Sequence, residues 1–169
     1  MSPSATLLLL LLAALPPGPL AAPSVLAAPA PWPAVSAQSE AFERRAVEAE
    51  VMAALDAFMA AFNAMDVEAW EATFHFPHYR LAGGDMRVLE TAGLQDGADL
   101  ERRLRATGWH HSAWERREIV HLSPEKAHVD TRFVRYRADG SVLAAFDSLY
   151  VLTREDGRWG VKLRSSFAP

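Results

Sequence analysis

The chain reads KAHVDTRFVRYRADGSVLAAFDSLYVLTREDGRWGVKLRSSF at residues 126–167. Asp-Gly occurs twice in this stretch, at 139–140 and 156–157, between segments rich in valine, leucine and aromatic residues. An Asp-Gly pair in this setting is among the strongest hairpin signals in a sequence. A Ser-Pro-Glu turn at 123–125 adds one strand upstream. The pattern predicts an antiparallel meander of four strands, at 111–122, 126–137, 141–153 and 159–167.

The segment before these strands has the periodicity of helices, which would cover one face of the sheet. Ser39 is a suitable N-cap for a long first helix, and Asp66 for a short second helix. The apolar residues of the first helix recur every three or four positions and form one stripe: Val47, Val51, Leu55, Phe58, Phe62 and Met65.

A hairpin and a third helix are predicted next. Pro77 cannot continue the second helix, so residues 75–78 are expected to form a bend. Gly-Gly-Asp at 83–85 then indicates a hairpin turn. Asp96 is a suitable N-cap for the third helix, which ends at Gly108. The predicted order of elements is therefore α-α-β-β-α-β-β-β-β.

The composition excludes several classes of protein. A net charge of −4 gives no basic surface for a nucleic acid, so no nucleic-acid partner is expected. The chain has no cysteine, which excludes disulfides, thiolate metal sites and a cysteine nucleophile. Its 169 residues suffice for one domain with a substantial core.

The first 39 residues carry no charged side chain. Residues 7–15 are a run of leucine and alanine, which ends at the Pro-Pro-Gly-Pro segment at 16–19. Such a run is too short to span a bilayer but fits the core of a secretory signal peptide. We therefore expect residues 1–38 to be a signal peptide plus a disordered Ala/Pro segment. The domain at 39–169 is then secreted or periplasmic, with no integral membrane segment in the mature chain. The alternative is a cytoplasmic protein with a disordered leader.

Three features of the sequence carry a resemblance to a known superfamily. They are the order of elements, the Asp-Gly-Arg-Trp hairpin at 156–159 and the helix junction Asn-Ala-Met-Asp-Val-Glu-Ala-Trp at 63–70. The domain at 39–169 resembles the nuclear transport factor 2-like superfamily, in particular its SnoaL-like and ketosteroid-isomerase-like branch. The resemblance implies an α+β fold in which a curved antiparallel sheet wraps around N-terminal helices as a cone. It also implies an apolar pocket at the wide end of the cone and a homodimer.

Strand alternation predicts which side chains enter this cone. In the last strand the inward set is Trp159, Val161, Leu163, Ser165 and Phe167. The outward set is Arg158, Lys162, Arg164 and Ser166. In the strand from residue 126 the inward set is Ala127, Val129, Thr131 and Phe133. In the strand from residue 141 both faces are apolar, and the larger set is placed inside: Phe146, Ser148, Tyr150 and Leu152.

The expected pocket combines these inward residues with two aromatic residues near the open end. Buried tyrosine and tryptophan carry a polar atom that needs a partner, so they often line a pocket. Inward hydroxyls likewise need a partner, which a ligand or water would supply. The predicted pocket residues are Tyr79, Trp109, Thr131, Phe133, Ser148, Tyr150 and Ser165, and the predicted ligand is a small apolar molecule.

His75 and His78 are the candidates for a catalytic proton carrier, placed at the mouth of the pocket. Their spacing is also that of metal ligands, but Pro77 between them removes the shared helix face, so no metal and no cofactor are expected. The ketosteroid-isomerase pattern has an aspartate towards the end of the first short strand, where this chain has Tyr-Arg-Leu-Ala-Gly at 79–83. Many relatives in the superfamily also carry a pocket histidine in the last strand, where this chain has Ser165.

Arginines cluster on one predicted strand and on the third helix: Arg132, Arg135, Arg137, Arg102, Arg103 and Arg105. Acidic residues lie between them in the sequence, which predicts a solvated, ion-paired face. Anion binding is the alternative.

Two hypotheses on function stay open, because the superfamily includes both enzymes and non-catalytic domains. The first is a small-molecule-binding protein with an apolar pocket, which would extend to a cofactor-independent isomerase, cyclase or hydrolase. The second is a non-catalytic dimeric accessory or protein-interaction domain. A titratable group inside the cone would favour catalysis, and the sequence places no carboxylate there.

Overall fold

A computed structural model describes residues 37–168, and side chains from Glu40 onward. The predicted leader at 1–38 lies almost entirely outside the described residues. No helix within residues 37–168 is long and apolar enough to cross a membrane.

The long first helix, α1, spans Ala37–Ala64. Its predicted apolar stripe faces the sheet, with Val51 and Leu55 fully buried. The chain then turns through Met65, which has a φ of 54°. Asp66 caps the short helix α2 (Val67–Glu71), as predicted, because its carboxylate accepts a hydrogen bond from the Ala69 amide.

The hairpin that follows is longer than predicted. Strand β1 covers Phe74–Ala82 and β2 covers Asp85–Leu89, joined by two glycines with positive φ. The bend predicted at 75–78 is wrong, because these residues belong to β1. Pro77, preceded by a cis peptide bond, lies where the register of β1 against its neighbour shifts. A proline is tolerated there because a shifted register needs no ladder hydrogen bond from it.

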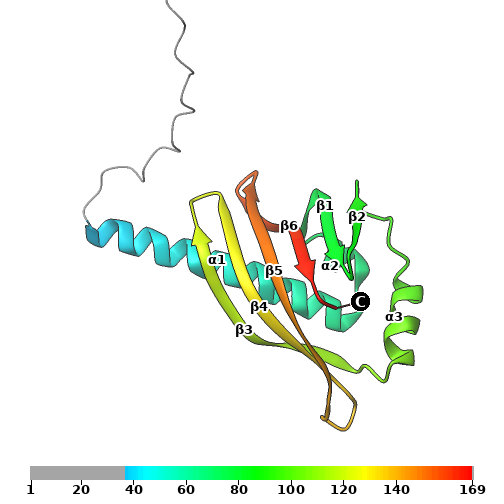
Figure 1. Ribbon diagram of the computed structural model, residues 1–169. Helices are drawn as coiled ribbons and strands as arrows, with labels where there is room; N and C mark the ends of the chain where they lie inside the picture. The colour runs from blue at the N-terminus through cyan, green and yellow to red at the C-terminus, as the bar shows by residue number, and fades with distance from the viewer. Residues whose placement is uncertain (1–36, 169) are drawn as a thin grey trace, which may run out of the picture. The chain divides into compact units, whose positions relative to one another are not determined.

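The third helix, α3, covers Gly97–Ala106 and is capped by Asp96, as predicted. The meander then forms as expected, with β3 (His111–Leu122), β4 (Lys126–Tyr136), β5 (Val142–Glu155) and β6 (Arg158–Ser166). The sheet order is β2-β1-β6-β5-β4-β3, and every pairing is antiparallel except that between β1 and β6. The final strand therefore lies inside the sheet (Figure 1).

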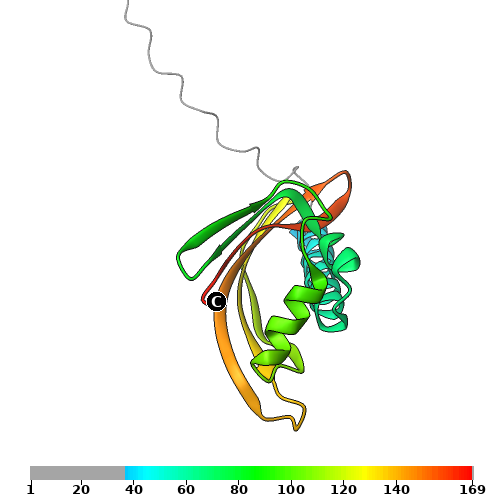
Figure 2. The same ribbon diagram turned by 90° about the vertical axis from the view of Figure 1, so that its right-hand side faces the viewer.

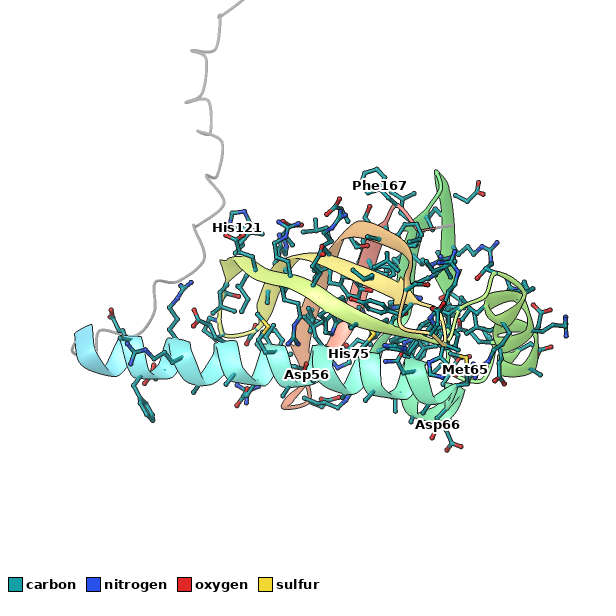
Figure 3. All side chains as sticks on the ribbon, turned by 90° about the horizontal axis from the view of Figure 1, so that it is seen from below. Asp56, Met65, Asp66, His75, His121 and Phe167 are labelled. Carbon is teal, nitrogen blue, oxygen red and sulfur yellow. The ribbon has the colours of Figure 1, made fainter. Side chains whose placement is uncertain are left out.

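The sheet curves around α1, and α3 lies on the same concave side (Figure 2). Asp66, the N-cap of α2, and Phe167, just beyond β6, lie on opposite sides of the sheet (Figure 3). The core between sheet and helix is mostly aromatic and aliphatic, and each fully buried side chain of this kind contributes roughly 1.5–3 kcal/mol. Its members include Phe58, Trp70, Phe74, Val129, Tyr150, Leu152 and Val161.

Candidate functional site

A cavity of about 330 Å³ opens on the concave side, between the helices and the sheet. Residues from all three helices and all six strands line it. Much of the wall is apolar or aromatic: Phe58, Met59, Phe62, Trp70, Leu100, Leu104, Phe133 and Ala168. The volume lies at the small end of the range of ligand pockets, about 300–1,000 Å³.

The polar part of the wall is dominated by arginine. The five arginines are Arg80, Arg87, Arg103, Arg135 and Arg164, and the remaining polar lining residues are Gln95, Thr107, Ser112, Tyr150 and Ser166. Among these lining residues there is no aspartate, glutamate, lysine or histidine. The cavity is therefore positively charged as well as apolar.

Arg164 enters the cavity because of a bulge in β6. Leu152 of β5 pairs with Val161, but Val151 pairs with Leu163, so Lys162 is an extra residue on the β6 side. An extra residue reverses which side chains face inward from that point on. The predicted inward placement of Leu163, Ser165 and Phe167 is therefore wrong. Arg164 and Ser166 line the cavity instead, and Phe167 is 81% exposed.

The Arg164 guanidinium packs on aromatic rings. Its central carbon lies 5.3 Å from the ring centroid of Phe58, 5.0 Å from that of Trp70 and 5.8 Å from that of Phe74. Burial lowers the pKa of Arg164, an effect that the adjacent Tyr150 hydroxyl opposes. Burial also raises the pKa of Tyr150, so the phenol stays neutral at physiological pH.

Two further arginines are partly withdrawn from water. Arg135 lies 5.1 Å from the Phe146 ring centroid, and burial lowers its pKa. Burial lowers the pKa of Arg80 to about 10, and repulsion from Arg164 and Arg87 adds to this. No carboxylate within residues 37–168 forms an ion pair with Arg87, Arg135 or Arg164.

Several lining residues carry buried N–H donors without an acceptor in the described structure. These atoms are Trp70 Nε1, Gln95 Nε2, Arg135 Nε and Arg164 Nε. A buried donor without a partner costs about 1–3 kcal/mol, so such atoms are rare in folded proteins. All four are donors, which is the pattern of a site that receives an acceptor.

An amide on α1 fixes the start of β3 at the edge of the cavity. Asn63 Nδ2 donates to the Ser112 carbonyl and its Oδ1 accepts from the Ser112 amide, both at 2.8 Å. Trp109 Nε1 donates to Ser112 Oγ at 2.9 Å. Trp109 is therefore a buried support of the wall, and it does not itself line the cavity.

Of the predicted pocket residues, Phe133 and Tyr150 line the cavity. Thr131 and Ser148 face inward and are buried, but protein atoms satisfy their hydroxyls. Thr131 Oγ1 donates to the Ser148 carbonyl at 3.0 Å, and Ser148 Oγ to Ser166 Oγ at 2.8 Å. Tyr79 precedes the lining residue Arg80 on β1 and so lies on the other face.

The two histidines are not at a pocket mouth, so that prediction is wrong. His78 is fully buried and stacks on Phe74, with ring centroids 4.1 Å apart. Its Nδ1 donates to the Val161 carbonyl at 2.9 Å. Burial, reinforced by Arg164, lowers the pKa of His78 to about 3, so the ring is neutral near pH 7. The predicted position of both histidines is wrong because Pro77 lies within β1, at a shift of register, and does not form a bend.

His75 is also buried and lies against Gly160 on β6. Its Nδ1 lies 2.9 Å from Thr153 Oγ1 and 3.6 Å from Glu155 Oε1. Burial is the largest cause of a lowered His75 pKa. No group of three or more histidine, aspartate or glutamate side chains in residues 37–168 could hold a metal ion.

The predicted arginine clusters divide between two environments. Arg132 is ion-paired on the outer face with Glu115 and Asp147, as a solvated face requires. Arg103 and Arg135, which come from the same two clusters, line the cavity. Arg103 also pairs with Asp99 at 2.8 Å.

The chain belongs to the family NTF2-like protein (DUF6841), whose model matches residues 48–163. The expected superfamily and α+β fold are thus confirmed. No curated protein matches the sequence.

Solved structures share the fold. An NTF2-like protein with a cystatin-like fold from Novosphingobium aromaticivorans is 14% identical, with a TM-score of 0.60, over 79% of this chain and 86% of that one. An NTF2-like protein from Shewanella oneidensis MR-1 is 16% identical, with a TM-score of 0.57, over 71% and 98%. A ketosteroid isomerase-like protein from Erwinia carotovora atroseptica SCRI1043 is 26% identical, with a TM-score of 0.52, over 72% and 96%.

Proposed function

We propose that this protein binds a small amphipathic anion in the cavity on the concave side of the sheet. The observation that carries the proposal is an apolar, arginine-lined cavity in which four buried N–H atoms of the lining lack an acceptor among the described residues. An anionic head group would accept from these donors, while the aromatic wall would hold an apolar body.

The cost of leaving the cavity empty supports this proposal. Withdrawing a guanidinium from water costs several kcal/mol, and a partner with good geometry is needed to offset it. Arg135 and Arg164 have aromatic neighbours but no ion pair with a carboxylate of residues 37–168. A bound carboxylate or phosphate would give charge-assisted hydrogen bonds to both.

Binding fits the lining better than acid-base catalysis does. A general acid or base needs a pKa near the working pH, and histidine and carboxylates are the usual side chains. Neither His75 nor His78 lines the cavity. Tyr150 has a raised pKa, and arginine stays protonated, so neither would exchange a proton readily at neutral pH. The ketosteroid isomerase-like neighbour therefore supports a ligand pocket here without a shared mechanism.

The test compares two ligands of equal shape. Calorimetry should show that 2-naphthoate binds and that 2-naphthamide, its neutral analogue, binds at least about tenfold more weakly, because only the acid gives charge-assisted bonds. Arg135→Gln should remove most of this difference. Arg132→Gln, on the outer face of the same strand, is the matched control and should leave it unchanged. Equal binding of the two ligands, or binding of neither, would refute the proposal and leave the accessory-domain hypothesis.

A further inference from the structure

Three of the cavity arginines occupy directly paired positions on neighbouring strands. Arg80 of β1 pairs with Arg87 of β2 on one side and with Arg164 of β6 on the other. Neighbouring strands lie about 4.8 Å apart, so the three side chains start from adjacent positions. All three line the cavity, and Tyr150 on β5 is paired with Arg164 at the end of this row. We call Arg87, Arg80 and Arg164 the arginine row.

Like charges at directly paired positions repel each other. The effect is visible in Arg80, whose pKa is lowered by Arg164 and Arg87 in addition to burial. Within residues 37–168, neither Arg87 nor Arg164 has an ion pair with a carboxylate that would separate the charges. A ligand with one negative charge would relieve only part of this repulsion, whereas a compact group with two charges would relieve more of it.

We infer that the arginine row binds a phosphate monoester whose organic part is apolar. This inference rests on the proposed function and names the head group of that ligand. A phosphate monoester carries about −1.5 to −2 charges at pH 7 and three acceptor oxygens on one atom. Guanidinium groups bind phosphate through parallel hydrogen bonds, so adjacent arginines can share one phosphate. The apolar part packs against the aromatic wall around Phe58 and Phe62.

The charge of the phosphate gives a test that needs no variant. Its second ionisation has a pKa of about 6, so the ester is a dianion at pH 8 and mostly a monoanion at pH 5. A carboxylate keeps one charge over the same interval. Calorimetry at both pH values with 2-naphthyl phosphate, 2-naphthoate and inorganic phosphate separates the contributions of charge and of apolar body.

At pH 8 we expect 2-naphthyl phosphate to bind at least about tenfold more tightly than 2-naphthoate, because of the second charge. Inorganic phosphate should bind more weakly than the ester because it lacks the apolar body. The preference for the ester over naphthoate should shrink at pH 5. Arg87→Gln, a change at an exposed strand position, should reduce binding of the ester more than binding of naphthoate. Arg132→Gln should change neither.

The outcomes distinguish this inference from the proposed function. Naphthoate binding as tightly as the ester at pH 8 would overturn the phosphate assignment and leave the proposed function standing. Inorganic phosphate binding as tightly as the ester would overturn the apolar part of the assignment. Binding of neither aromatic anion would overturn both proposals.

Discussion

At the scale of one side chain, the buried guanidinium of Arg164 affects both stability and the proposed binding. Desolvation of its guanidinium costs several kcal/mol, and cation–π contacts with the surrounding rings return roughly 2 kcal/mol when desolvated. The proposed function requires that these contacts and the interaction with the Tyr150 hydroxyl offset only part of the desolvation cost when no ligand is bound. Sites that need a strained or desolvated group commonly give up stability in this way.

We therefore expect Arg164→Met to raise the free energy of unfolding of the ligand-free protein by about 1 kcal/mol, because methionine fills similar space without a charge. Urea unfolding at pH 7 measures this. Arg158→Met is the control on the same strand. The Arg158 guanidinium donates to the Ala72 and Phe74 carbonyls at 2.9 Å, so its loss should lower stability. A loss of more than about 1 kcal/mol in Arg164→Met would mean that the guanidinium is satisfied without a ligand.

His78 makes stability depend on pH. Its pKa is about 3 in the folded protein and about 6.5 in the unfolded chain, so between these values the unfolded chain binds the extra proton. The contribution of His78 is complete above pH 6.5 and is lost as pH falls towards 3. The slope is at most about 1.4 kcal/mol per pH unit.

Between pH 6.5 and 4.5, urea unfolding should show that His78→Asn loses less stability per pH unit than wild type, even though the variant is less stable at pH 7. Asparagine retains a donor for the Val161 carbonyl but cannot take up a proton. His121→Asn, at an exposed position on β3, should keep the wild-type slope. Equal slopes for wild type and His78→Asn would show that another group governs the loss of stability between pH 6.5 and 4.5.

Strand elements were predictable where the pairing is regular. Alternation gave the inward faces of β4 and β5 correctly, because these strands pair without a shift from Lys126 to Arg135. It failed in β6 because of the bulge at Lys162, for which Gly160, two residues earlier in the strand, is only a weak signal. One extra residue was enough to exchange Ser165 for Arg164 at the site.

The arginines of β1 and β2 are a sequence signal for an anion site in the cavity. A two-residue turn at Gly83 and Gly84 places Arg80 opposite Arg87, and such a pair is unfavourable unless an anion is near. The overall architecture followed from turns, caps and periodicity, which are local. The cavity did not, because its arginines converge from separate hairpins and a helix. The predicted homodimer stays a prediction.

The contact between β1 and β6 depends on a glycine. A methyl group on Gly160 would lie 2.9 Å from His75 Cδ2, closer than side-chain carbons approach each other in practice. We expect Gly160→Ala to lower stability by about 1–3 kcal/mol through overpacking. In a double-mutant cycle, His75→Ala should relieve the clash, so the double variant should lose about 1 kcal/mol less than the sum of the single losses. Losses that add within about 0.3–0.5 kcal/mol would show that the ring is free to move aside.

At the scale of the whole molecule, we propose that the protein is exported and that its leader is removed. The motive is the uncharged first 39 residues with their leucine-rich run. The intact mass of protein recovered from its source should correspond to a new amino terminus between Ala22 and Ala37. A product that retains Met1 in the cytoplasm would contradict the proposal.

The internal position of β6 has a consequence for synthesis on the ribosome. Strand β6 follows the other five strands along the described chain, yet it lies between β1 and β5 and supplies Arg164 and Ser166 to the cavity. A nascent chain that has folded β1 to β5 therefore still presents two unpaired strand edges until β6 leaves the ribosome. Because a chain without β6 cannot complete the cavity, the proposed ligand could be captured only after β6 has emerged. A premature stop inside β6 would release a chain that is both unable to bind and prone to edge-to-edge association.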